Sequence, residues 1–452
     1  MLRKTSISLR LVIAAILIVC LCRTSPSRAA DFFGIGYLEP DDNFSSADWI
    51  SRDGSAIVGR SLRSFSFEFH SGPRTYYTYQ RAFIRDADGK RPLVTPASYF
   101  GGDLVTDVAP FGSAAFIWPV GNENQIDGLT VGTYSDPGMQ IWTPEHSLVA
   151  VENGRFPKRF AGDKDTYAGI LRSSVFDLLL SHAFRHTAQE GDRDLGWIAP
   201  TKGTVNPVRE ESSDATGISA DGNVVVGTNR ARTDRALFTL SNSTVYVEWP
   251  NTFYATEAFR WTPDVGMKPL GYLPNTDFSK ANGVSGDGKV IFGQCAKDVT
   301  SIGFRWTEAT EMTPIAALLE GQTAIINAAN FDGSILVGSS EYFPWGMLQL
   351  VDGQLREALA TAVIWDSAHG LRDLKVVLET EYGQNLTGWQ LTTATDISDD
   401  GRTIIGNGIN PQGNQEGWIA HLDPVAVPEP AAWTLFAVGA CSAATISRRR
   451  RA

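Results

Sequence analysis

The chain has 452 residues, 43% of them hydrophobic, and its 50 acidic residues outnumber 39 basic ones, which gives a net charge of −11. A chain of this length can bury a large apolar core without disulfide bonds. Because the excess of acid repels nucleic acid and anionic lipid, we exclude nucleic-acid binding as a function.

The segment 1–29 has the pattern of a secretory signal peptide. Basic residues precede an apolar run over 11–21, and the small residues Ser27 and Ala29 follow it. Such a run is too short for a stable membrane-spanning helix, and small residues at this spacing mark a cleavage site. We expect cleavage after Ala29 and export of the body, residues 30–424.

A short element recurs along this body. Asp-Gly, four residues and a closing glycine make up "RDGSAIVG" (52–59), "ADGNVVVG" (220–227), "GDGKVIFG" (286–293), "FDGSILVG" (331–338) and "DDGRTIIG" (399–406). "GDKDTYAG" (162–169) and "IDGLTVG" (126–132) are degenerate copies. Asp-Gly favours a tight turn, the β-branched run a buried strand, and the last glycine a bend or close approach.

The aspartates of these elements are predicted to be structural. Each copy supplies one carboxylate, whereas calcium needs several oxygen ligands. We therefore assign turn roles, and no metal, to Asp53, Asp221, Asp287, Asp332 and Asp400.

A second element follows each copy of the first. It reads "AFIR" (82–85), "QIW" (140–142), "AFRH" (183–186), "AFRW" (258–261), "GFRW" (303–306), "AVIW" (362–365) and "GWIA" (417–420), with "AFIW" (115–118) as an extra copy. Alternate side chains of such a segment lie on one face of a strand. The segments 266–274 and 370–374 predict a further strand after a turn.

Three or more strands in each of about seven units predict an all-β repeat protein, a β-propeller, and the spacing is also compatible with six or eight blades. The segment 34–54 aligns with 269–288, so the body begins with the third element and ends after the second. A ring requires this offset, because the N-terminal strand then completes the last blade. We expect residues 34–38 to pair with the sheet that contains 415–422.

The alternation of "DG…VVG" and "HAF-W" units, with "HAFRH" at 182–186, resembles the HAF family of bacterial extracellular repeats. The resemblance is loose in the first half of the body and good from about residue 214 onward. It implies secretion and a repeat architecture, and it implies no particular activity.

Insertions collect between the first and the second element of each repeat. One point in a repeat corresponds to one face of a propeller, and such a face often binds ligands. Three insertions, 64–80, 243–254 and 341–346, are rich in aromatic residues, which suit sugar rings or a protein partner. The alternative is that these segments are extra hairpin strands. The candidate ligand-binding residues are Tyr77, Tyr79, Trp249, Tyr254, Tyr342 and Trp345.

No residue is predicted to be catalytic. His182 and His186 have the i, i+4 spacing of a zinc helix, but the segment lacks the glutamate of that motif and reads as a strand. The acid pairs 210–211 and 399–400 fall in predicted turns, and the sequence contains no nucleophile elbow, phosphate loop or cysteine–histidine pair. We therefore expect neither a metal nor a cofactor.

Cysteine usage predicts no disulfide in the body. Cys20 and Cys22 lie in the leader and Cys441 in the tail, so Cys295 alone remains, and we expect it to be a small buried residue on a strand. A lipoprotein signal at Cys20 or Cys22 is the alternative for the leader, but neither cysteine follows the small residue that such a signal has.

The tail, residues 425–452, contains Pro-Glu-Pro, an apolar stretch over 431–446 and an arginine cluster. A helix of this length spans about 24 Å, less than the roughly 30 Å hydrocarbon core, and its arginines stay cytoplasmic. The order of these parts resembles the PEP-CTERM sorting signal. That resemblance implies a short transmembrane helix, cut by an exosortase-type membrane protease; a plain tail anchor is the alternative. The implied recognition residues are Pro428, Glu429, Pro430, Arg448, Arg449, Arg450 and Arg451.

These features predict a secreted repeat protein that is tethered transiently to the inner membrane and then released to the cell surface or matrix. We expect it to act without catalysis on extracellular polysaccharide or a surface protein, or as a passive structural component. The alternative is a secreted glycan-active enzyme on the same scaffold. Convergent acids at the mouth of the central channel would favour the enzyme, and exposed aromatic residues on the insertion face would favour the binding protein.

Overall fold

The computed structural model describes residues 31–67, 75–93, 102–109, 113–120, 125–126, 129–130, 140–144, 147–150, 155–172, 181–199, 201, 211–232, 238–240, 243–245, 254–297, 300–342, 348–351, 354–357 and 360–422. Phe32–Leu422 forms one compact unit. The segments predicted to be a signal peptide and a sorting signal with a short transmembrane helix lie outside the described residues. Among the helices in the described ranges, none has the length and apolar character needed to cross a membrane.

The described strands pair into seven antiparallel modules of four strands each. Module 1 comprises β2 (Phe44–Ile50), β3 (Ile57–Phe67), β4 (Thr75–Asp86) and β5 (Gly89–Pro92), and module 2 comprises β6 (Gly102–Val108), β7 (Ala115–Val120), β10 (Gln140–Thr143) and β11 (Ser147–Ala150). Module 3 comprises β12 (Arg155–Phe160), β13 (Tyr167–Arg172), β14 (Ser181–Thr187) and β15 (Gly191–Asp194), and module 4 comprises β16 (Glu211–Ile218), β17 (Val225–Arg232), β20 (Tyr254–Thr262) and β21 (Gly266–Gly271).

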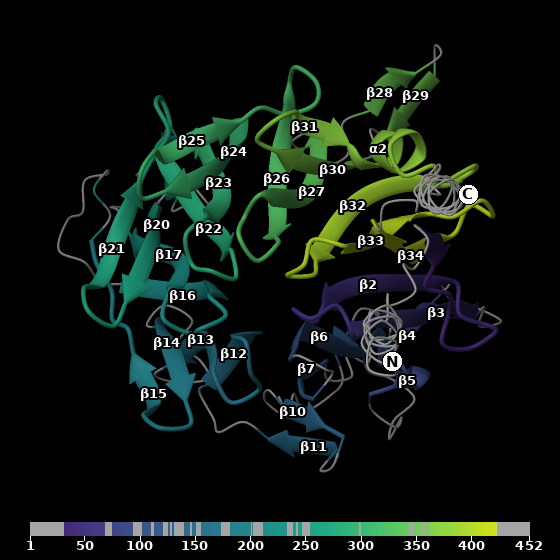
Figure 1. Cartoon of the computed structure of the whole chain (residues 1–452), viewed down its shortest axis with the longest axis horizontal. Helices are drawn as coiled ribbons and strands as arrows, with labels where there is room; N and C mark the ends of the chain where they lie inside the picture. The colour runs from purple at the N-terminus through teal and green to yellow at the C-terminus, as the bar shows by residue number, and fades with distance from the viewer. Residues whose placement is uncertain are drawn as a thin grey trace, which may run out of the picture. The chain divides into compact units, whose positions relative to one another are not determined.

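The remaining modules follow the same order. Module 5 comprises β22 (Phe278–Val284), β23 (Ile291–Lys297), β24 (Thr300–Thr307) and β25 (Glu311–Ile315), and module 6 comprises β26 (Gln322–Ala329), β27 (Ile335–Tyr342), β30 (Thr361–Asp366) and β31 (Gly370–Asp373). Module 7 comprises β32 (Gln390–Ile397), β33 (Thr403–Ile409), β34 (Gln415–His421) and β1 (Phe32–Gly34). Figure 1 shows the modules around a central axis with their first strands innermost, which is the β-propeller type of all-β fold.

The first described strand lies beside the last. β1 pairs with β34 in antiparallel register, from Phe32 opposite Ala420 to Gly34 opposite Trp418. The backbone N–H of Ile35 then donates to the carbonyl of Gly417 over 2.7 Å. The N-terminal segment therefore pairs with the predicted sheet, but its strand is Phe32–Gly34, so only Gly34 of the predicted residues 34–38 lies in it. No sheet of the described part closes on itself, because each module is a separate meander or joins one neighbour.

The glycine that ends each first element allows a close approach between strands. In module 4 the first strand bulges between Ala215 and Gly217, opposite Gly227. A Cβ on Gly227 would collide with the carbonyl of Asp214 and with the ring of Phe259, which belongs to the second element. Gly59 with Phe83, Gly293 with Phe304 and Gly406 with Trp418 repeat this contact. The two recurring sequence elements are thus the two sides of one packing contact.

The predicted Asp-Gly turns are present between the first and second strands. The hydroxyl of Ser219 donates to Asp221 over 2.5 Å and accepts the backbone N–H of Val224 over 2.9 Å. Gly222 has φ +71°, a conformation that glycine adopts at little cost. Partial burial alone would raise the pKa of Asp221, but hydrogen bonds from Ser219 and Asn223 together hold it below its usual value. Ser51, Ser285 and Ser398 contact Asp53, Asp287 and Asp400 in the same way, and the N–H of Ser334 donates to Asp332.

One predicted repeat copy is wrong. The segment 126–132 overlaps the small hairpin of β8 (Gln125–Ile126) and β9 (Leu129–Thr130), which is a separate two-stranded sheet between β7 and β10. The equivalent turn of module 2 lies at 109–114 instead, where the N–H of Ala109 donates to the carbonyl of Ala114, as Ser219 does to Val224. The segment 115–118 is accordingly a second strand, and not an extra copy of the second element. The Asp-Gly pattern failed here because "APFGSA" (109–114) has a glycine but no aspartate before it.

Extra elements lie at the ends of strands. Two further hairpins, β18 (Phe238–Leu240) with β19 (Ser243–Val245) and β28 (Leu348–Val351) with β29 (Gln354–Glu357), join second and third strands as β8 and β9 do. A short helix, α2 (Leu374–Thr380), follows β31, and Asp373 caps it by accepting the N–H of Lys375. The segment 370–374 was predicted to be a strand, and its last residue begins this helix.

Candidate functional site

A cavity that is partly open to solvent lies where the seven first strands meet, and the empty space there, open solvent included, is about 610 Å³. Each first strand has a bulged residue near its inner end, and β32 has a second one, Thr392. The second residue after the inner bulge lines the cavity in every module. We call this the axial cavity. These lining residues are Ile50, Val108, Phe160, Ile218, Val284, Ala329 and Ile397.

The bulged residues fasten each module to the next along half of the axial cavity. Asn282 donates its side-chain N–H to the carbonyl of Ile326, and Asn327 donates to that of Ala394, each over 2.9 Å. Thr216 and Thr395 make the same contact through their hydroxyls, to Ala281 over 2.8 Å and to Ala47 over 2.7 Å. Modules 4, 5, 6, 7 and 1 are therefore joined in sequence by neutral side chains.

A second chain of contacts joins the turns at one end of the modules. Backbone N–H groups donate from Gly162 to Ala220, from Ala220 to Gly286, from Asp287 to Phe331, from Phe331 to Asp399 and from Asp399 to Arg52, over 2.7 to 2.9 Å. Each link runs from one module to the following one, from module 3 through module 7 to module 1. Because these bonds use the main chain, the turn sequence is free to vary before the aspartate.

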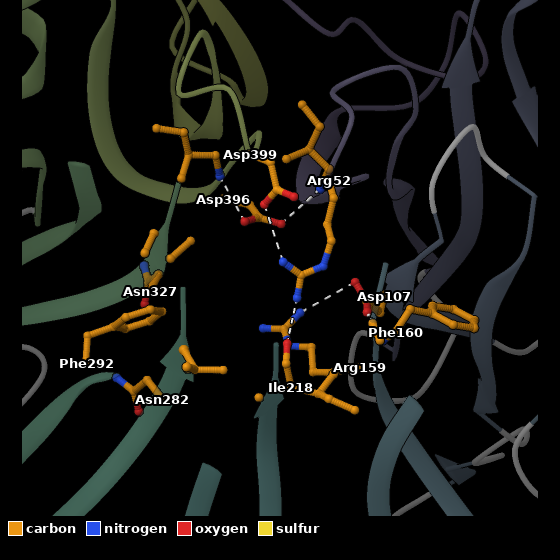
Figure 2. A pocket seen from close by; sticks show the side chains of 18 of the residues that line it. Arg52, Asp107, Arg159, Phe160, Ile218, Asn282, Phe292, Asn327, Asp396 and Asp399 are labelled. Atoms are coloured by element: carbon orange, nitrogen blue, oxygen red, sulfur yellow. Dashed lines mark hydrogen bonds and ion pairs between the residues drawn. The ribbon is translucent and has the colours of Figure 1, made fainter. Parts of the chain in front are cut away.

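The residue directly after each bulge divides the axial cavity into two unlike halves. Modules 4, 5 and 6 have the small residues Gly217, Gly283 and Ala328 there. Modules 7, 2 and 3 have Asp396, Asp107 and Arg159, and module 1 has Trp49. Figure 2 shows Arg52 and Arg159 reaching into the cavity on the side of the three aspartates, with Asn282, Asn327 and Phe292 across from them. The cavity therefore has a charged wall and an opposite wall of small, amide and apolar groups.

Asp107 fastens module 2 to module 3. Its buried carboxylate accepts the N–H of Phe160 over 2.6 Å and lies 3.7 Å from the guanidinium of Arg159. Burial raises the pKa of Asp107, and the charge of Arg159 opposes that rise. Arg159 also stacks 3.4 Å from the ring of Trp49 and donates to the carbonyl of Thr216. One arginine thus links modules 1, 2, 3 and 4.

Asp396 occupies the equivalent place in module 7. It accepts the N–H of Ile50 over 3.1 Å, as Asp107 accepts that of Phe160, and it accepts the N–H of Ile397 over 2.9 Å. Desolvation raises the pKa of Asp396 to about 7, although Arg159 at longer range lowers it. Among the described residues no cation forms an ion pair with Asp396.

The third aspartate, Asp399, forms an ion pair with Arg52. Arg52 contacts it over 3.3 Å and donates to the carbonyl of Ile218, across the cavity, over 2.6 Å. Burial raises the pKa of Asp399, and Arg52 opposes that rise. Three carboxyls thus converge as the enzyme alternative requires, but two of them are paired with arginines and only Asp396 is not.

Sequence reasoning missed Asp107, Arg159 and Asp396, and it assigned Asp399 to a turn only. Asp107 and Arg159 lie in the part of the chain where the repeat is degenerate. Asp396 carries a signal that could have been used: "ATDIS" (394–398) has aspartate where "ATGIS" (215–219) and "ANGVS" (281–285) have glycine. A charged residue that replaces a repeated glycine on an inner strand points to a position on the axis.

The predicted aromatic ligand residues lie at the expected junction. The backbones of Tyr77 and Tyr79 lie in β4, that of Tyr254 in β20 and that of Tyr342 in β27, close to where second strands lead to third strands. β3 and β4 pair as far as Phe67 opposite Thr75, so the first insertion prolongs a hairpin, as the alternative interpretation stated. Trp249 and Trp345 lie outside the described residues.

The histidines and the cysteine have structural partners. His186 lies on β14, as predicted, with its Nδ1 2.5 Å from Asp192 and its ring stacked on Tyr167. His182 contacts Asp194 over 3.0 Å. Cys295 is fully buried on β23, as predicted, and its sulfur lies 3.2 Å from that of Met312. In the described ranges no three histidine, cysteine or acidic side chains converge as they would around a metal ion.

The chain matches no protein family and no curated protein. It is similar to solved propeller structures at low identity. The structure of the Dos1 propeller aligns with 87% of this chain and 95% of its own at 10% identity and a TM-score of 0.40. TolB from Acinetobacter baumannii aligns with 81% and 80% at 10% identity and 0.36, and oligopeptidase B from Trypanosoma brucei with 83% and 54% at 12% identity and 0.38. These TM-scores are too low to bear on function, and the architecture rests on the strand pairing described above.

Proposed function

We propose that the seven modules are the blades of one closed propeller that serves as a secreted, non-enzymatic binding protein of the cell surface or matrix. Seven equivalent residues line one cavity, and β1 completes the module that precedes the β2 module in space. The sorting route through an exosortase-type protease rests on the tail sequence alone. An extracellular polysaccharide is the proposed ligand, and a surface protein is the alternative.

The observation that carries this proposal is the one-sided placement of the insertions. Every turn in the chain of backbone hydrogen bonds from Gly162 to Arg52 joins a first strand to a second strand, so these turns share one end of the modules. The connections from second to third strands leave from the opposite end. All three extra hairpins and all three aromatic insertions are such connections. We call this end the insertion face, and exposed aromatic rings on it would stack on sugar rings.

A glycan array with the purified protein tests this proposal. Trp249→Ala and Trp345→Ala are expected to weaken binding about tenfold or more, as removal of an aromatic anchor does at a binding hot spot. Phe331→Ala is a matched control, because this aromatic residue is 46% exposed at the opposite end, in a turn of module 6. Binding that both tryptophan variants keep, or that Phe331→Ala loses equally, would contradict a ligand site on the insertion face.

A second candidate function is glycan hydrolysis in the axial cavity. Asp396 favours it, because its pKa of about 7 suits a group that donates and accepts protons near neutral pH. Glycosidases of this kind need two carboxyl groups on opposite sides of the scissile bond. Release of reducing sugar from the bound polysaccharide, abolished by Asp396→Asn, would establish the enzyme and displace the binding proposal.

A further inference from the structure

Two equivalent aspartates of the axial cavity differ in one respect. Asp107 and Asp396 both follow the bulge of a first strand, and both accept the N–H of the second residue after the bulge in the next module. Asp107 has Arg159 at ion-pair distance. Asp396 makes no ion pair with any described residue, so the same structural role is carried out by a carboxylate without a cation.

The charge of the lining is correspondingly unbalanced. The titratable groups that line the axial cavity are Arg52, Asp107, Arg159, Asp396 and Asp399. Arg52 forms an ion pair with Asp399, and Arg159 forms one with Asp107. The negative charge of Asp396 is therefore not balanced by an ion pair within the described part of the chain. Asp396 is partly buried and accepts two backbone N–H groups, but no described cation balances its charge. Desolvating such a carboxylate is costly, and the pKa of Asp396, which burial raises to about 7, reflects that cost.

Module 6, next to Asp396, also contributes less bulk to the lining. The second residue after the bulge is Ile50, Val108, Phe160, Ile218, Val284 or Ile397 in the other modules, but in module 6 it is Ala329. The residue before it is Ala328, and the corresponding residue of module 5 is Gly283. Small residues thus accompany the unpaired carboxylate, whereas the equivalent carboxylate of module 2 has an arginine beside it.

The remaining lining suits an ion that carries N–H groups. Asn282 and Asn327 line the axial cavity and use their amide nitrogens for contacts with the next module, which leaves the amide oxygens as hydrogen-bond acceptors. Ile50, Val284 and Phe292 provide apolar surface. A carboxylate, two amide oxygens and apolar walls are complementary to an alkylammonium group.

We propose that the axial cavity binds a small primary alkylammonium ion, which lies against Asp396 as Arg159 lies against Asp107. The ion's charge balances the lining, its N–H groups donate to Asp396 and to the amide oxygens of Asn282 and Asn327, and its alkyl part contacts the apolar walls. This site is separate from the insertion face, so it does not depend on what that face binds.

Calorimetric titration of the purified protein with n-butylammonium chloride at pH 8 and low salt tests the proposal. We expect binding of one equivalent, and no binding of the neutral analogue n-butanol. Asp396→Asn is expected to weaken binding about tenfold or more, because it removes a charge-assisted contact. Glu308→Gln, a change at an exposed acid in the turn between β24 and β25, is the matched control and is expected to bind normally.

A second variant keeps the carboxylate of Asp396 and fills the space beside it in the axial cavity. Ala329→Ile introduces the residue found at the equivalent positions 50, 218 and 397, so the fold is expected to tolerate it, with an unchanged circular dichroism spectrum and lost butylammonium binding. Absence of binding to the unaltered protein, equal binding by Asp396→Asn, or displacement of the ligand by equimolar KCl would overturn the proposal. Ala329→Ile that is folded and still binds would overturn the position of the site.

Discussion

Side chains join neighbouring modules in two different ways, one in modules 4 to 7 and the other in modules 2 and 3. In modules 4 to 7 a threonine or asparagine at the bulge donates to a carbonyl of the next module. In modules 2 and 3 the corresponding contacts are charged: Asp107 with Phe160 and Arg159, and Lys158 with Asp214. The regular repeat sequence is thus one way to fasten neighbouring strands, and the degenerate region keeps the fold by substituting ion pairs.

The difference also places the polar wall of the axial cavity. The threonine and asparagine side chains that join modules 4 to 7 occupy little volume, and the small residues that follow them in modules 4 to 6 leave space. A charged side chain that joins modules extends further into the axial cavity. Arg159, for example, contacts both Trp49 and Thr216. The irregular modules 2 and 3 thus supply Asp107 and Arg159 to the charged wall, and the regular modules 7 and 1 supply Asp396, Asp399 and Arg52.

The largest expected effect is that of Asp107→Ala. The substitution leaves the N–H of Phe160 and the partly buried Arg159 without their carboxylate. Breaking a buried pair costs about 3–5 kcal/mol, and the partial exposure of Arg159 places the expected loss at the lower end, about 3 kcal/mol. Urea denaturation measures the free energy of unfolding, with Glu308→Ala as the exposed control. A loss below about 1 kcal/mol would show that the charged fasteners are dispensable.

The second prediction concerns pH. Burial keeps the pKa of Asp396 in the folded protein, about 7, above its unfolded value, so the folded state binds this proton more tightly. The contribution of Asp396 is therefore present below pH 4 and is lost as the pH rises to about 7, with a slope of at most about 1.4 kcal/mol per pH unit. Asp396→Asn is expected to flatten the pH dependence of the unfolding free energy in this window, and an unchanged slope would contradict it.

Removal of a neutral fastener is expected to cost less. Asn327→Ala deletes the hydrogen bond to the carbonyl of Ala394, at about 1–2 kcal/mol. Because no charge is involved, the loss should be the same at low and at high salt. A loss that falls with added salt would mean that this side of the axial cavity also depends on electrostatics.

The smallest expected effect is that of Lys158→Met. Lys158 contacts both carboxylate oxygens of Asp214 over 2.7 and 2.8 Å, but both side chains are partly exposed. The expected loss is below about 1 kcal/mol and should vanish near 1 M salt. The unfolding free energies of Lys158→Met and Asn327→Ala at two salt concentrations therefore distinguish the charged from the neutral contacts between modules.

The parts of the fold that local sequence determines were predictable. Asp221 and Gly222 form a turn through their own backbone preferences, and the serine two residues before the aspartate, which was overlooked, recurs at the same spacing in four of the clear copies. The pairing of β1 with β34 followed from the offset of the repeat. The turn at 109–114 was harder to find, because "APFGSA" keeps the glycine of "SADGNV" (219–224) but has neither its serine nor its aspartate.

The candidate site depends on contacts that no single repeat contains. Asp107 acquires its role from a backbone N–H in the following module, and Arg159 from a tryptophan and a carbonyl in two others. Such partners come together only when the modules are placed around one axis. Comparison of equivalent positions would have singled out Asp396 and Ala329, since each departs from what its sister repeats have.

The pairing of β1 with β34 delays the completion of the fold during synthesis. The N–H of Gly36 donates to the carboxylate of Glu416, 380 residues later, so a ribosome must make nearly the whole chain before this contact can form. Contacts so distant in sequence form slowly. A polypeptide that cannot finish folding until its last strand emerges remains suitable for threading through a translocation pore for as long as it is being made.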